Sequence, residues 1–443
     1  MAVIGAGFTG SLTALHLLER GAPDLRIHLI ERTPGFGPGL AYGTHNPQHL
    51  LNVRVGNMSA YPDQPGHLEH WLRGEDGQGA AAFVTRGAYG RYLASMLREA
   101  VGRADGARRL ILEHDEAVDL KPHDEGVRLT LAMGRTLDVD ATILAVGNPP
   151  PATPPGLGLE ALPESFYAPD PWLAAALDGV ASDAPVLLLG TGLTMVDIAL
   201  ALDARGHAGP VLAVSRRGLT PRRHGDLPPV AGEITDTPNG RASHLLRQTR
   251  RRAEEIGWRE AVDELRPLTP AIWRGAGVDE RGRFLRHLRP WWDVHRHRMA
   301  PAVADRVEAL RGEARLVVAA GRILGVEARN EGVVVAWRPR GTAREDVAIV
   351  GRIINCTGPE GDPSRSREPL IRRLIDNGLA RVDALGLGLE IDDESRLVDP
   401  TGVAASRLYA VGPITRGSLW EVTAVPDIRN QVADLARRLS PRP

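Results

Sequence analysis

Apolar positions along this chain fall into short runs of strand length, separated by segments in which they recur at helical spacing. The run at 2–4 leads into a glycine-rich turn, and leucines at 12, 15 and 18 then share one face of a predicted helix. A further apolar run at 27–30 follows as the next predicted strand. Strands that alternate with helices in this way form parallel β-α-β units, so the chain is of the α/β class.

The second half of the chain repeats this plan. Apolar runs at 185–189 and 211–214 are predicted strands, and the segment between them has helical spacing. Each half also carries a meander of alternating residues and then a closing strand, at 109–139 and 141–147 in the first half and at 315–350 and 353–358 in the second. We therefore predict two Rossmann-like dinucleotide-binding domains of the three-layer flavoprotein type.

The segment from about 225 to 310 differs from both halves, because it is helical in period and rich in arginine, histidine and tryptophan. We interpret it as a mainly helical insertion in the second nucleotide domain. The strand at 408–412 and the final helix near 426–439 have no sheet of their own, so we expect the chain to return to the first domain. The predicted organisation is a first domain over 1–178, a second domain over 179–345 and a completion of the first domain over 346–443.

The composition is that of an ordinary globular protein and argues against several classes of function. Hydrophobic residues make up 43% and charged residues 25%, and a net charge of -1 gives no reason to expect nucleic acid or an anionic membrane as partner. The single cysteine, Cys356, excludes an intrachain disulfide and a paired-cysteine redox centre. No apolar stretch reaches the length of a bilayer span and no signal-peptide pattern is present, so we expect a cytoplasmic protein. No spaced set of histidine and cysteine ligands is present either, so we predict no metal site.

Three glycines, Gly5, Gly7 and Gly10, follow the first strand directly and open the first helix. Glycines in this setting allow a tight turn, a close approach of the backbone to a diphosphate, and close helix packing. Glu31 ends the next strand, where an acid accepts hydrogen bonds from the ribose of an adenosine. The glycine pattern alone is weak evidence and is also found in simple turns. Together with the strand, the helix and the terminal acid, it indicates a dinucleotide site.

A second glycine turn, at Gly190 and Gly192, follows the first strand of the second half, but Met195 holds the third glycine position. The next strand ends in Arg216 and Arg217 rather than in an acid. Arginine at that place suits the 2′-phosphate of NADPH, whereas NAD sites prefer an acid. We therefore favour NADPH, and the alternative interpretation is a solvated charge pair after a strand.

Two further segments each allow two interpretations. Residues 34–43 are rich in glycine and, together with 50–53 and 57–60, either wrap a flat ring system by close backbone approach or form a long surface loop. The insertion gathers arginine, histidine and tryptophan between 273 and 298. That composition indicates either a cationic, aromatic-walled pocket for an acidic substrate or a helical face with core tryptophans and solvated arginines.

Together these segments resemble the bacterial FAD/NAD(P)-binding proteins related to flavin-dependent monooxygenases and N-hydroxylases. The resemblance covers nearly the whole chain and rests on VIGAGFTG, GPGLAYGT, HLLNVRVGNMSAYPD, GTGLTMVD with SRRGLTPRRH, RFLRHLRPWWDVHRHRMAP and GSLWEVTAVPDIRNQV. It implies a non-covalent FAD with Gly5, Gly7, Gly10 and Glu31 at its adenosine half and Tyr42, Asn52, Met58 and Ser59 near the flavin. The expected FAD-binding set is completed by Phe8, Thr9, Arg32, Gly147 and Gly412, and the expected NADPH-binding set is Gly190, Gly192, Arg216 and Arg217. One departure is Gly412-Pro413, where many FAD folds have Gly-Asp.

The resemblance also implies an activity, because some relatives oxygenate the nitrogen of amino acids, aspartate included. In such enzymes flavin reduced by NADPH reacts with molecular oxygen to give a hydroperoxide, which an unprotonated amine attacks, so no protein nucleophile is required. Cationic side chains would bind the carboxylates, and the expected substrate-binding residues are Arg54, Arg91, Arg289 and His295. We predict an NADPH-dependent flavin monooxygenase acting on a small acidic amino acid. The alternatives are a flavin oxidoreductase that passes electrons to another acceptor and a non-catalytic FAD-binding redox sensor.

Overall fold

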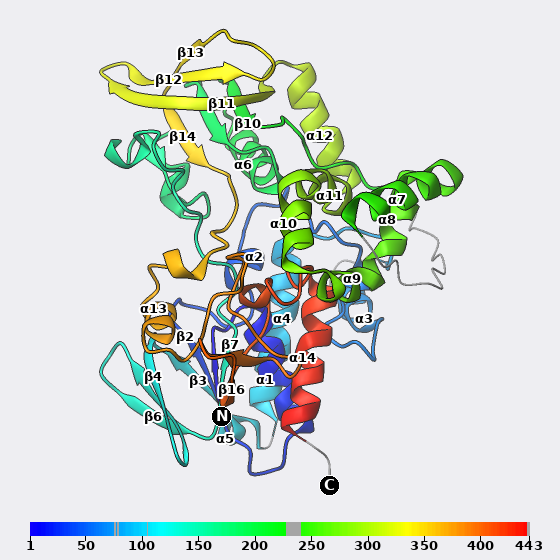
Figure 1. Ribbon diagram of the computed structural model, residues 1–443, viewed down its shortest axis with the longest axis vertical. Helices are drawn as coiled ribbons and strands as arrows, with labels where there is room; N and C mark the ends of the chain where they lie inside the picture. Colours follow the sequence, from blue (N-terminus) through cyan, green and yellow to red (C-terminus); the bar gives the residue numbers. More distant parts are fainter. Residues whose placement is uncertain (75–76, 78, 104, 227–240, 441–443) are drawn as a thin grey trace.

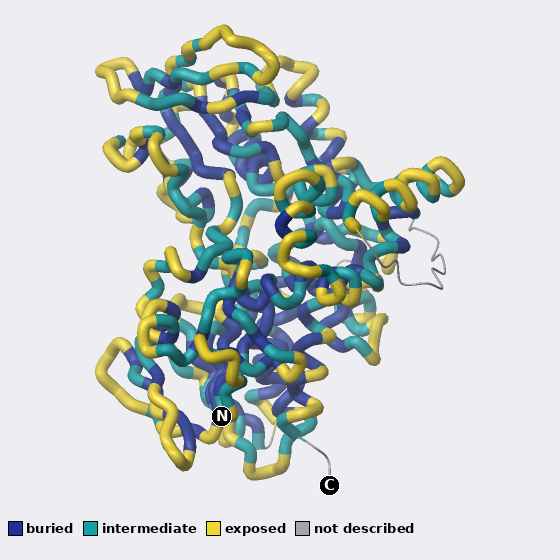
Figure 2. Tube along the Cα trace, viewed as in Figure 1, coloured by how far each residue is buried: buried dark blue, intermediate teal, exposed yellow. Residues whose placement is uncertain are grey.

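The chain forms two domains, each built on its own large sheet, with a group of helices beside the waist between them (Figure 1). The structure, a computed structural model, describes residues 1–74, 77, 79–103, 105–226 and 241–440. Buried residues concentrate around each of the two sheets (Figure 2). Each sheet therefore has a hydrophobic core of its own.

The first domain is built on a six-stranded sheet whose strand order is β15 (Arg396–Val398), β16 (Ala404–Ala410), β7 (Thr142–Leu144), β1 (Ala2–Ile4), β2 (Ile27–Glu31) and β3 (Leu110–His114). All neighbours are parallel except the pair β15 and β16. One face is covered by the helices α1 (Phe8–Arg20), α4 (Arg86–Gly102) and α14 (Val425–Leu439). The other face is covered by α13 (Pro369–Asp376) and by an antiparallel meander of β4 (Ala117–His123), β5 (Gly126–Leu131) and β6 (Thr136–Val139). The predicted three-layer arrangement is confirmed.

The last strand and the last helix belong to this first domain, although they lie far away in the sequence. Strand β16 pairs in parallel with β7, so that Leu408 lies opposite Thr142 and Tyr409 opposite Ile143. Helix α14 packs against α1 in the same hydrophobic cluster. The end of the chain therefore lies in the first sheet and its helical layer.

The second domain is built on a seven-stranded sheet whose strand order is β13 (Asp346–Val350), β12 (Gly332–Pro339), β11 (Leu316–Arg329), β10 (Val211–Ser215), β9 (Val186–Leu189), β14 (Arg352–Asn355) and β8 (Tyr167–Ala168). All four residues of β9 are buried, as is typical of a central parallel strand. The first part of β11 pairs in parallel with β10, and its remainder forms an antiparallel hairpin with β12. Helices α6 (Leu193–Ala204) and α12 (Pro301–Gly312) pack together against one face of the sheet.

Two of these strands correct the predicted domain boundaries. Strand β8 lies before position 179 and β14 lies after position 345, yet β14 pairs with both β9 and β8 in the second sheet. The second domain therefore includes 167–168, and the chain leaves it only after 355. The predicted ranges of the first domain, 1–178 and 346–443, were therefore wrong at positions 178 and 346. Strand periodicity does not show which sheet a short strand joins.

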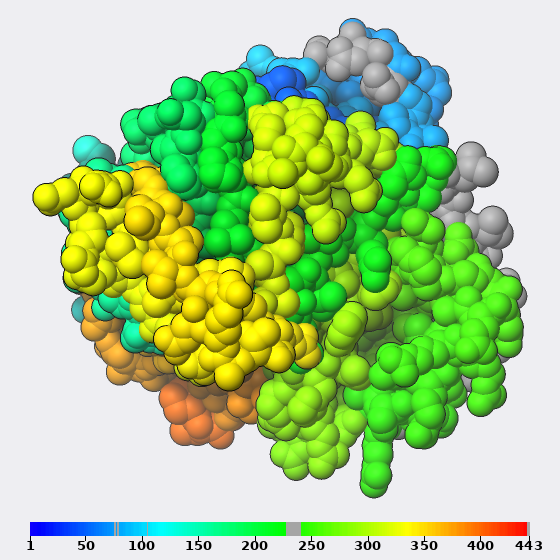
Figure 3. All heavy atoms as spheres, turned by 90° about the horizontal axis from the view of Figure 1, so that it is seen from above, coloured from blue at the N-terminus to red at the C-terminus, as the bar shows by residue number. Residues whose placement is uncertain are grey.

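The insertion is helical, as predicted, but it is shorter than 225–310. Its helices are α7 (Ala242–Ile256), α8 (Trp258–Leu265), α9 (Thr269–Gly275), α10 (Val278–His287) and α11 (Arg289–Arg296). Residues 227–240 of the predicted insertion lie outside the described residues. Helix α12 belongs to the second domain, because Ala304, Val307 and Leu310 join its core. Seen from above, the insertion lies beside the hairpin strands of the second domain (Figure 3).

Short helices lie in the connecting loops. They are α2 (Gly39–Tyr42), α3 (His67–Arg73), α5 (Gly106–Arg109), η1 (Val55–Asn57), η2 (Leu159–Ala161), η3 (Ala174–Ala176), η4 (Arg266–Leu268), η5 (Pro363–Arg365) and η6 (Pro413–Thr415).

Candidate functional site: two dinucleotide loops

The first glycine loop joins β1 to α1 and has the close approaches that the sequence predicts. Gly5 has φ +95°, and a Cβ there would lie 2.5 Å from the carbonyl oxygen of Ala145. A Cβ at Gly10 would lie 1.7 Å from the carbonyl oxygen of Gly5, so the helix crosses the loop where only glycine fits. Gly7 is the N-cap of α1, without a side-chain cap or an acid in the first turn. The helix N-terminus therefore offers its N–H groups to an anion such as the diphosphate of FAD.

Glu31 at the end of β2 is held against this loop. Its Oε2 accepts a hydrogen bond from the backbone N–H of Ala6 at 2.7 Å, and its Oε1 accepts one from the hydroxyl of Thr33 at 2.7 Å. The carboxylate is thus fixed beside the glycine turn, where it fits a ribose. The neighbouring Arg32 pairs with Glu116 at 3.4 Å and also with Glu368 in the returning segment, so the protein itself engages this guanidinium.

The glycine-rich segment 34–43 lies directly against the glycine loop. A Cβ at Gly39 would lie 2.7 Å from the Cα of Gly7, which excludes a side chain at that crossing. Tyr42 follows, and its ring meets Phe8 edge-on at 6.0 Å between centroids and Tyr89 at 4.7 Å. Burial raises the pKa of Tyr42 to about 12, so its hydroxyl remains protonated at neutral pH. The segment is therefore a packed part of the site.

Asn52, Met58 and Ser59 have mainly structural contacts. Met58 is a fully buried member of the first core. The Ser59 hydroxyl donates to the carbonyl oxygen of Gln64 at 2.7 Å and is also buried. The carbonyl oxygen of Asn52 lies 2.9 Å from Nε2 of His224 in the second domain. These contacts fix the loop, and they leave the Met58 and Ser59 side chains no exposed surface toward a ligand.

The turn after β16 completes the first loop. Gly412 has φ +79°, and a Cβ there would lie 2.8 Å from the hydroxyl of Thr9 at the start of α1. The N–H of Gly412 donates to Oε1 of Gln431 on α14 at 2.8 Å. Gln431 therefore fixes this turn, in which proline follows the glycine in place of an aspartate. Gly147, after β7, has φ +71° and open space around its Cα, so a ligand has access to its backbone.

The second glycine loop has the same design. Gly190 has φ +114°, and a Cβ there would lie 2.4 Å from the carbonyl oxygen of Cys356. Gly192 is the N-cap residue of α6, and a Cβ there would meet no other atom within 4 Å. As in α1, the helix has no side-chain cap and no acid in its first turn. Met195, at the third glycine position, is fully buried in the core. The fold thus accommodates the larger residue and keeps the helix N-terminus free for an anion.

The predicted 2′-phosphate residues stand beside that second loop. Ser215 ends β10, and its hydroxyl lies 2.8 Å from Oγ1 of Thr191 and accepts the N–H of Gly218 at 3.0 Å. Arg216 is exposed and Arg217 half-buried, and neither side chain forms an ion pair within the part of the chain that the structure describes. As far as the described residues go, both guanidinium groups are therefore available to a phosphate.

The predicted substrate-binding residues lie apart from one another. Arg54 is 9% exposed and donates from Nη1 to the carbonyl oxygen of Ala81 at 2.5 Å and from Nη2 to that of Gly225 at 2.6 Å. Backbone carbonyl groups thus use both of its terminal nitrogens, and its expected role in substrate binding stays a prediction. Arg91 is exposed on α4. Arg289 and His295 both lie on α11 of the insertion.

The two residues on α11 differ in their surroundings. His295 has its Nδ1 2.7 Å from the carbonyl oxygen of Trp291 and its ring edge-on to Trp258, and burial lowers its pKa. It is therefore mainly neutral and a poor partner for a carboxylate. Arg289 donates from Nε to Asp293 at 3.3 Å, and its side chain is 43% exposed. Arg289 remains available to a ligand.

The tryptophans and arginines of the insertion fit neither of the two sequence interpretations completely. Trp273 is buried and stacks on Trp420 of the segment after β16, with centroids 4.8 Å apart and planes at 27°. Arg298 is 2% exposed and pairs with Asp263 at 2.9 Å. Trp273 is thus a core residue, as expected for a helical face with core tryptophans. Arg298, however, is buried and paired, whereas that interpretation expected solvated arginines. The insertion is thus anchored to the first domain near Gly412.

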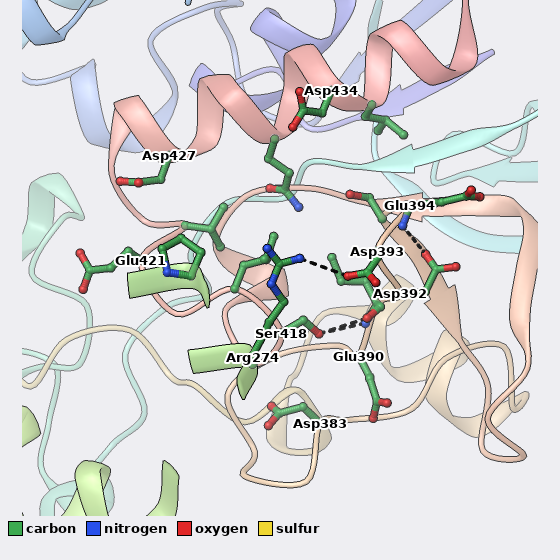
Figure 4. Close-up of a pocket in the computed structure, with 18 of the residues that line it drawn as sticks. Arg274, Asp383, Glu390, Asp392, Asp393, Glu394, Ser418, Glu421, Asp427 and Asp434 are labelled. Carbon is green, nitrogen blue, oxygen red and sulfur yellow. Dashed lines mark hydrogen bonds and ion pairs between the residues drawn. The ribbon is translucent and has the colours of Figure 1, made fainter. Parts of the chain in front are cut away.

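A cavity of about 610 Å³ lies between the insertion, the segment 383–395 and α14 (Figure 4). Three distant parts of the chain form it, and the sequence offered no signal for it. Acidic side chains predominate in its lining, namely Asp383, Glu390, Asp392, Asp393, Glu394, Glu421, Asp427 and Asp434, against Arg274, Arg281 and Arg438. The lining contains none of the predicted site residues, and its charge does not suit an acidic ligand.

Within the described ranges, no three histidine, cysteine, aspartate or glutamate side chains are grouped to hold a metal ion. Among the helices of that part of the chain, none has the length and apolar character that a membrane span requires. Cys356 is buried, and burial raises the pKa of its thiol.

Two glycine loops, each at an uncapped helix N-terminus, define a protein with two dinucleotide-binding domains. Residues 2–149 match the family model described as FAD-NAD(P)-binding, so the first domain is an FAD/NAD(P)-binding domain. In structure the chain is similar to an ornithine N-hydroxylase of Kutzneria sp. 744, with a TM-score of 0.65 and 15% identity over 99% of this chain and 98% of that one. It is also similar to an L-lysine 6-monooxygenase of Pseudomonas syringae, with a TM-score of 0.66 and 18% identity over 99% and 98%. The chain therefore has the fold of flavin-dependent N-hydroxylating monooxygenases.

In sequence the chain is similar to a nitrosuccinic acid synthase of Aspergillus oryzae (strain ATCC 42149 / RIB 40). The two are 29% identical over 171 residues, which covers 34% of this chain and 26% of that protein. The match thus spans about a quarter of the length of that curated relative.

Proposed function

We propose that the protein is an FAD-dependent, NADPH-using monooxygenase that oxygenates the amino nitrogen of a small acidic amino acid such as aspartate. The two uncapped helix N-termini, at Gly7 and Gly192, are the main support, because one dinucleotide on each domain is the minimum such a reaction needs. A protein that only sensed redox state would have less need of a second nucleotide loop.

The first domain fits FAD at several points. The N-terminus of α1 would bind the diphosphate, Glu31 would accept from the adenosine ribose, and the open backbone at Gly147 would admit the cofactor. Bound FAD would supply the redox chemistry, accepting hydride from NADPH and activating oxygen. The protein would orient the substrate amine and keep water from the reacting atoms.

The second domain fits NADPH better than NADH. An acid at the end of β10 would accept from the ribose of NADH, whereas this chain places Arg216 and Arg217 there. Neither arginine has an ion-pair partner in the described part of the chain, so a 2′-phosphate would bind without displacing a carboxylate.

The substrate class rests on the relatives' names. The structural neighbours are named for ornithine and lysine, while the sequence relative is named for nitrosuccinic acid, which carries a nitro group where aspartate carries its amine. The similarity of the substrates' chemistry supports oxygenation of an amino nitrogen. The sequence relative favours a dicarboxylic amino acid.

Oxygen uptake by the FAD-loaded protein with NADPH tests the proposal, with aspartate, glutamate, ornithine and lysine compared and the products identified by mass spectrometry. We expect uptake that rises with aspartate and yields its hydroxylamine or nitro product. NADPH oxidation that forms only hydrogen peroxide, whichever amine is present, would contradict the monooxygenase. Turnover with an artificial acceptor, without an oxygenated product, would instead indicate a flavin oxidoreductase.

A further inference from the structure

Two side chains of the first domain hold Asp197, a buried residue of helix α6 in the second domain. Arg86 at the start of α4 contacts its carboxylate with both terminal nitrogens, since Nη1 lies 2.8 Å from Oδ2 and Nη2 donates to Oδ1 at 3.1 Å. Nε2 of His49 lies 2.9 Å from the backbone carbonyl oxygen of Asp197. A carbonyl oxygen only accepts hydrogen bonds, so Nε2 carries the proton and donates. The first domain thus engages both the side chain and the backbone of Asp197.

His49 is itself fixed within the first domain, where it is 6% exposed. Its Nδ1 lies 2.9 Å from the hydroxyl of Thr44, and that hydroxyl accepts the N–H of Asn46 at 3.2 Å, which leaves its own proton to donate to Nδ1. The carbonyl oxygen of His49 accepts the backbone N–H of Arg86 at 2.8 Å. Both ring nitrogens of His49 are therefore engaged, and the two residues that donate to Asp197 are bonded to each other.

The chain that leads to His49 is packed against the first glycine loop. A Cβ at Gly39 would lie 2.7 Å from the Cα of Gly7. Further along the chain, a Cβ at Gly90 on α4 would lie 2.4 Å from the carbonyl oxygen of Tyr42. Backbones that approach so closely leave this segment little room to move, because protein interiors are close-packed. A closely packed path thus runs from the first dinucleotide loop to His49.

Asp197 in turn lies near the second dinucleotide loop. It is five residues after Gly192, the N-cap residue of α6, and therefore little more than one helical turn from the N-terminus proposed for NADPH. A second contact supports the same arrangement, because Nε2 of His224 lies 2.9 Å from the carbonyl oxygen of Asn52 and again must donate. The contacts to Asp197 therefore fix the N-terminus of α6 relative to the first domain.

We propose that Arg86 and His49 are positioning residues that act through Asp197 and hold the two dinucleotide loops at a fixed separation, so that hydride transfer needs no rotation of either domain. In that step NADPH loses a hydride and becomes NADP⁺, and FAD takes the hydride up and is reduced. The inference rests on the proposed function for the use of two dinucleotides. A displacement of reacting groups by about 1 Å, caused by a distant substitution, can slow a reaction about 100-fold.

The distance between two spin labels, one on each domain, tests the fixed arrangement without turnover. The label sites are Arg98→Cys on α4 and Glu308→Cys on α12, because both positions are exposed on helices. Cys356 is buried, so the native thiol stays unlabelled. We expect one narrow distance distribution in the FAD-loaded protein, unchanged by NADP⁺. His49→Ala in the labelled protein should broaden it.

Anaerobic reduction of the bound flavin by NADPH, followed by stopped-flow absorbance, tests the positioning role. His49→Ala should lower the rate constant at saturating NADPH about 10-fold and change the Kd for NADPH less than about 3-fold, because the reacting groups are misplaced and the nucleotide loop is intact. His49→Gln keeps an N–H donor for the carbonyl of Asp197 and should recover most of the rate. His207→Ala is the matched control, since this buried histidine also contacts a carbonyl oxygen through Nε2, that of Ala184 at 2.9 Å, but within the second domain. It should change neither the rate constant nor the label distance.

A second distance population in the wild-type protein, with or without NADP⁺, would overturn the proposal. So would a His49→Ala variant with the wild-type distance distribution and rate constant. FAD content and far-UV circular dichroism show whether each variant has folded. If His49→Ala loses FAD, then Arg86→Lys decides, because it keeps the charge and loses the paired contact, and wild-type values would likewise overturn the proposal. Flavin reduction that meets these expectations without an oxygenated product would retain the positioning residues and remove the proposed monooxygenase function.

Discussion

The ion pair between Arg86 and Asp197 joins the two dinucleotide domains, and its removal tests whether this contact stabilises their arrangement. Arg86 begins α4 in the first domain and Asp197 lies on α6 in the second, with Nη1 and Oδ2 2.8 Å apart. The two side chains are 17% and 7% exposed. His49 of the first domain also has its Nε2 2.9 Å from the carbonyl oxygen of Asp197. The substitution Arg86→Met would therefore leave a buried carboxylate at the domain boundary without its cation.

The expected loss of stability follows from this burial. Removing one partner of a buried pair costs about 3–5 kcal/mol, because the remaining charge is uncompensated. Burial already raises the pKa of Asp197, and loss of the arginine would raise it further. When the pKa of a carboxyl group is higher in the folded protein than in the unfolded chain, where it is about 3.9, the folded protein is most stable below about pH 3.9. Its stability then falls as the pH rises through the folded-state pKa. The deficit of Arg86→Met should thus be smaller at pH 5 than at pH 8.

Urea unfolding at both pH values, followed by tryptophan fluorescence and circular dichroism, measures this deficit. With a slope of roughly 4 kcal/mol per molar for a chain of this size, the midpoint at pH 8 should fall by about 1 M. The double variant Arg86→Met with Asp197→Asn should be less destabilised than the sum of the single variants, by about 2 kcal/mol. Arg205→Met is the control, because its pair with Asp178 is exposed on both sides and should contribute under about 1 kcal/mol. Additive effects, or equal deficits at the two pH values, would refute a buried interdomain pair.

Three further predictions concern single residues. Arg216→Ala should raise the KM for NADPH about 10- to 100-fold and leave that for NADH nearly unchanged, and equal effects would remove the 2′-phosphate assignment. Cys356 is 3% exposed with a raised thiol pKa, so a thiol reagent at pH 8 should label it in urea but hardly at all in the native protein, and rapid native labelling would contradict this. Burial lowers the pKa of His224 from 6.5 to about 4, so stability should fall as pH drops below 6.5, by about 2 kcal/mol at pH 5. Urea midpoints at pH 7 and pH 5 would show this, and a His224→Gln variant that loses as much stability as wild type would contradict it.

The sequence predicted the nucleotide loops well because their backbone leaves little choice of residue. At Gly5 and Gly190 a positive φ coincides with a carbonyl oxygen within 2.5 Å of any Cβ, so only glycine fits. The chain's return to the first domain was also predictable, since the apolar strand near 408–412 had no other partner. Such local constraints are visible in the sequence, because they depend on single positions and their immediate neighbours.

Features that depend on which segments meet were harder to predict. The two residues of β8 carry too short a pattern to identify a strand, yet they pair with β14 and extend the second sheet. From the sequence alone, Arg54 cannot be distinguished from an arginine that binds a ligand carboxylate. In the fold, its guanidinium donates to two backbone carbonyl groups from distant loops. Neither contact has a signal in periodicity or spacing.

Pairing also separates the arginines that maintain the structure from those that remain available to a ligand. Arg296 and Arg298 are buried and each has a carboxylate at hydrogen-bonding distance or close to it, so a substrate would have to displace a protein partner. Arg216, in contrast, is exposed and has no ion-pair partner among the described residues, so a ligand phosphate would not have to displace a carboxylate. Arg296 and Arg298 therefore maintain the insertion and its contact with the first domain, and Arg216 remains available to a ligand.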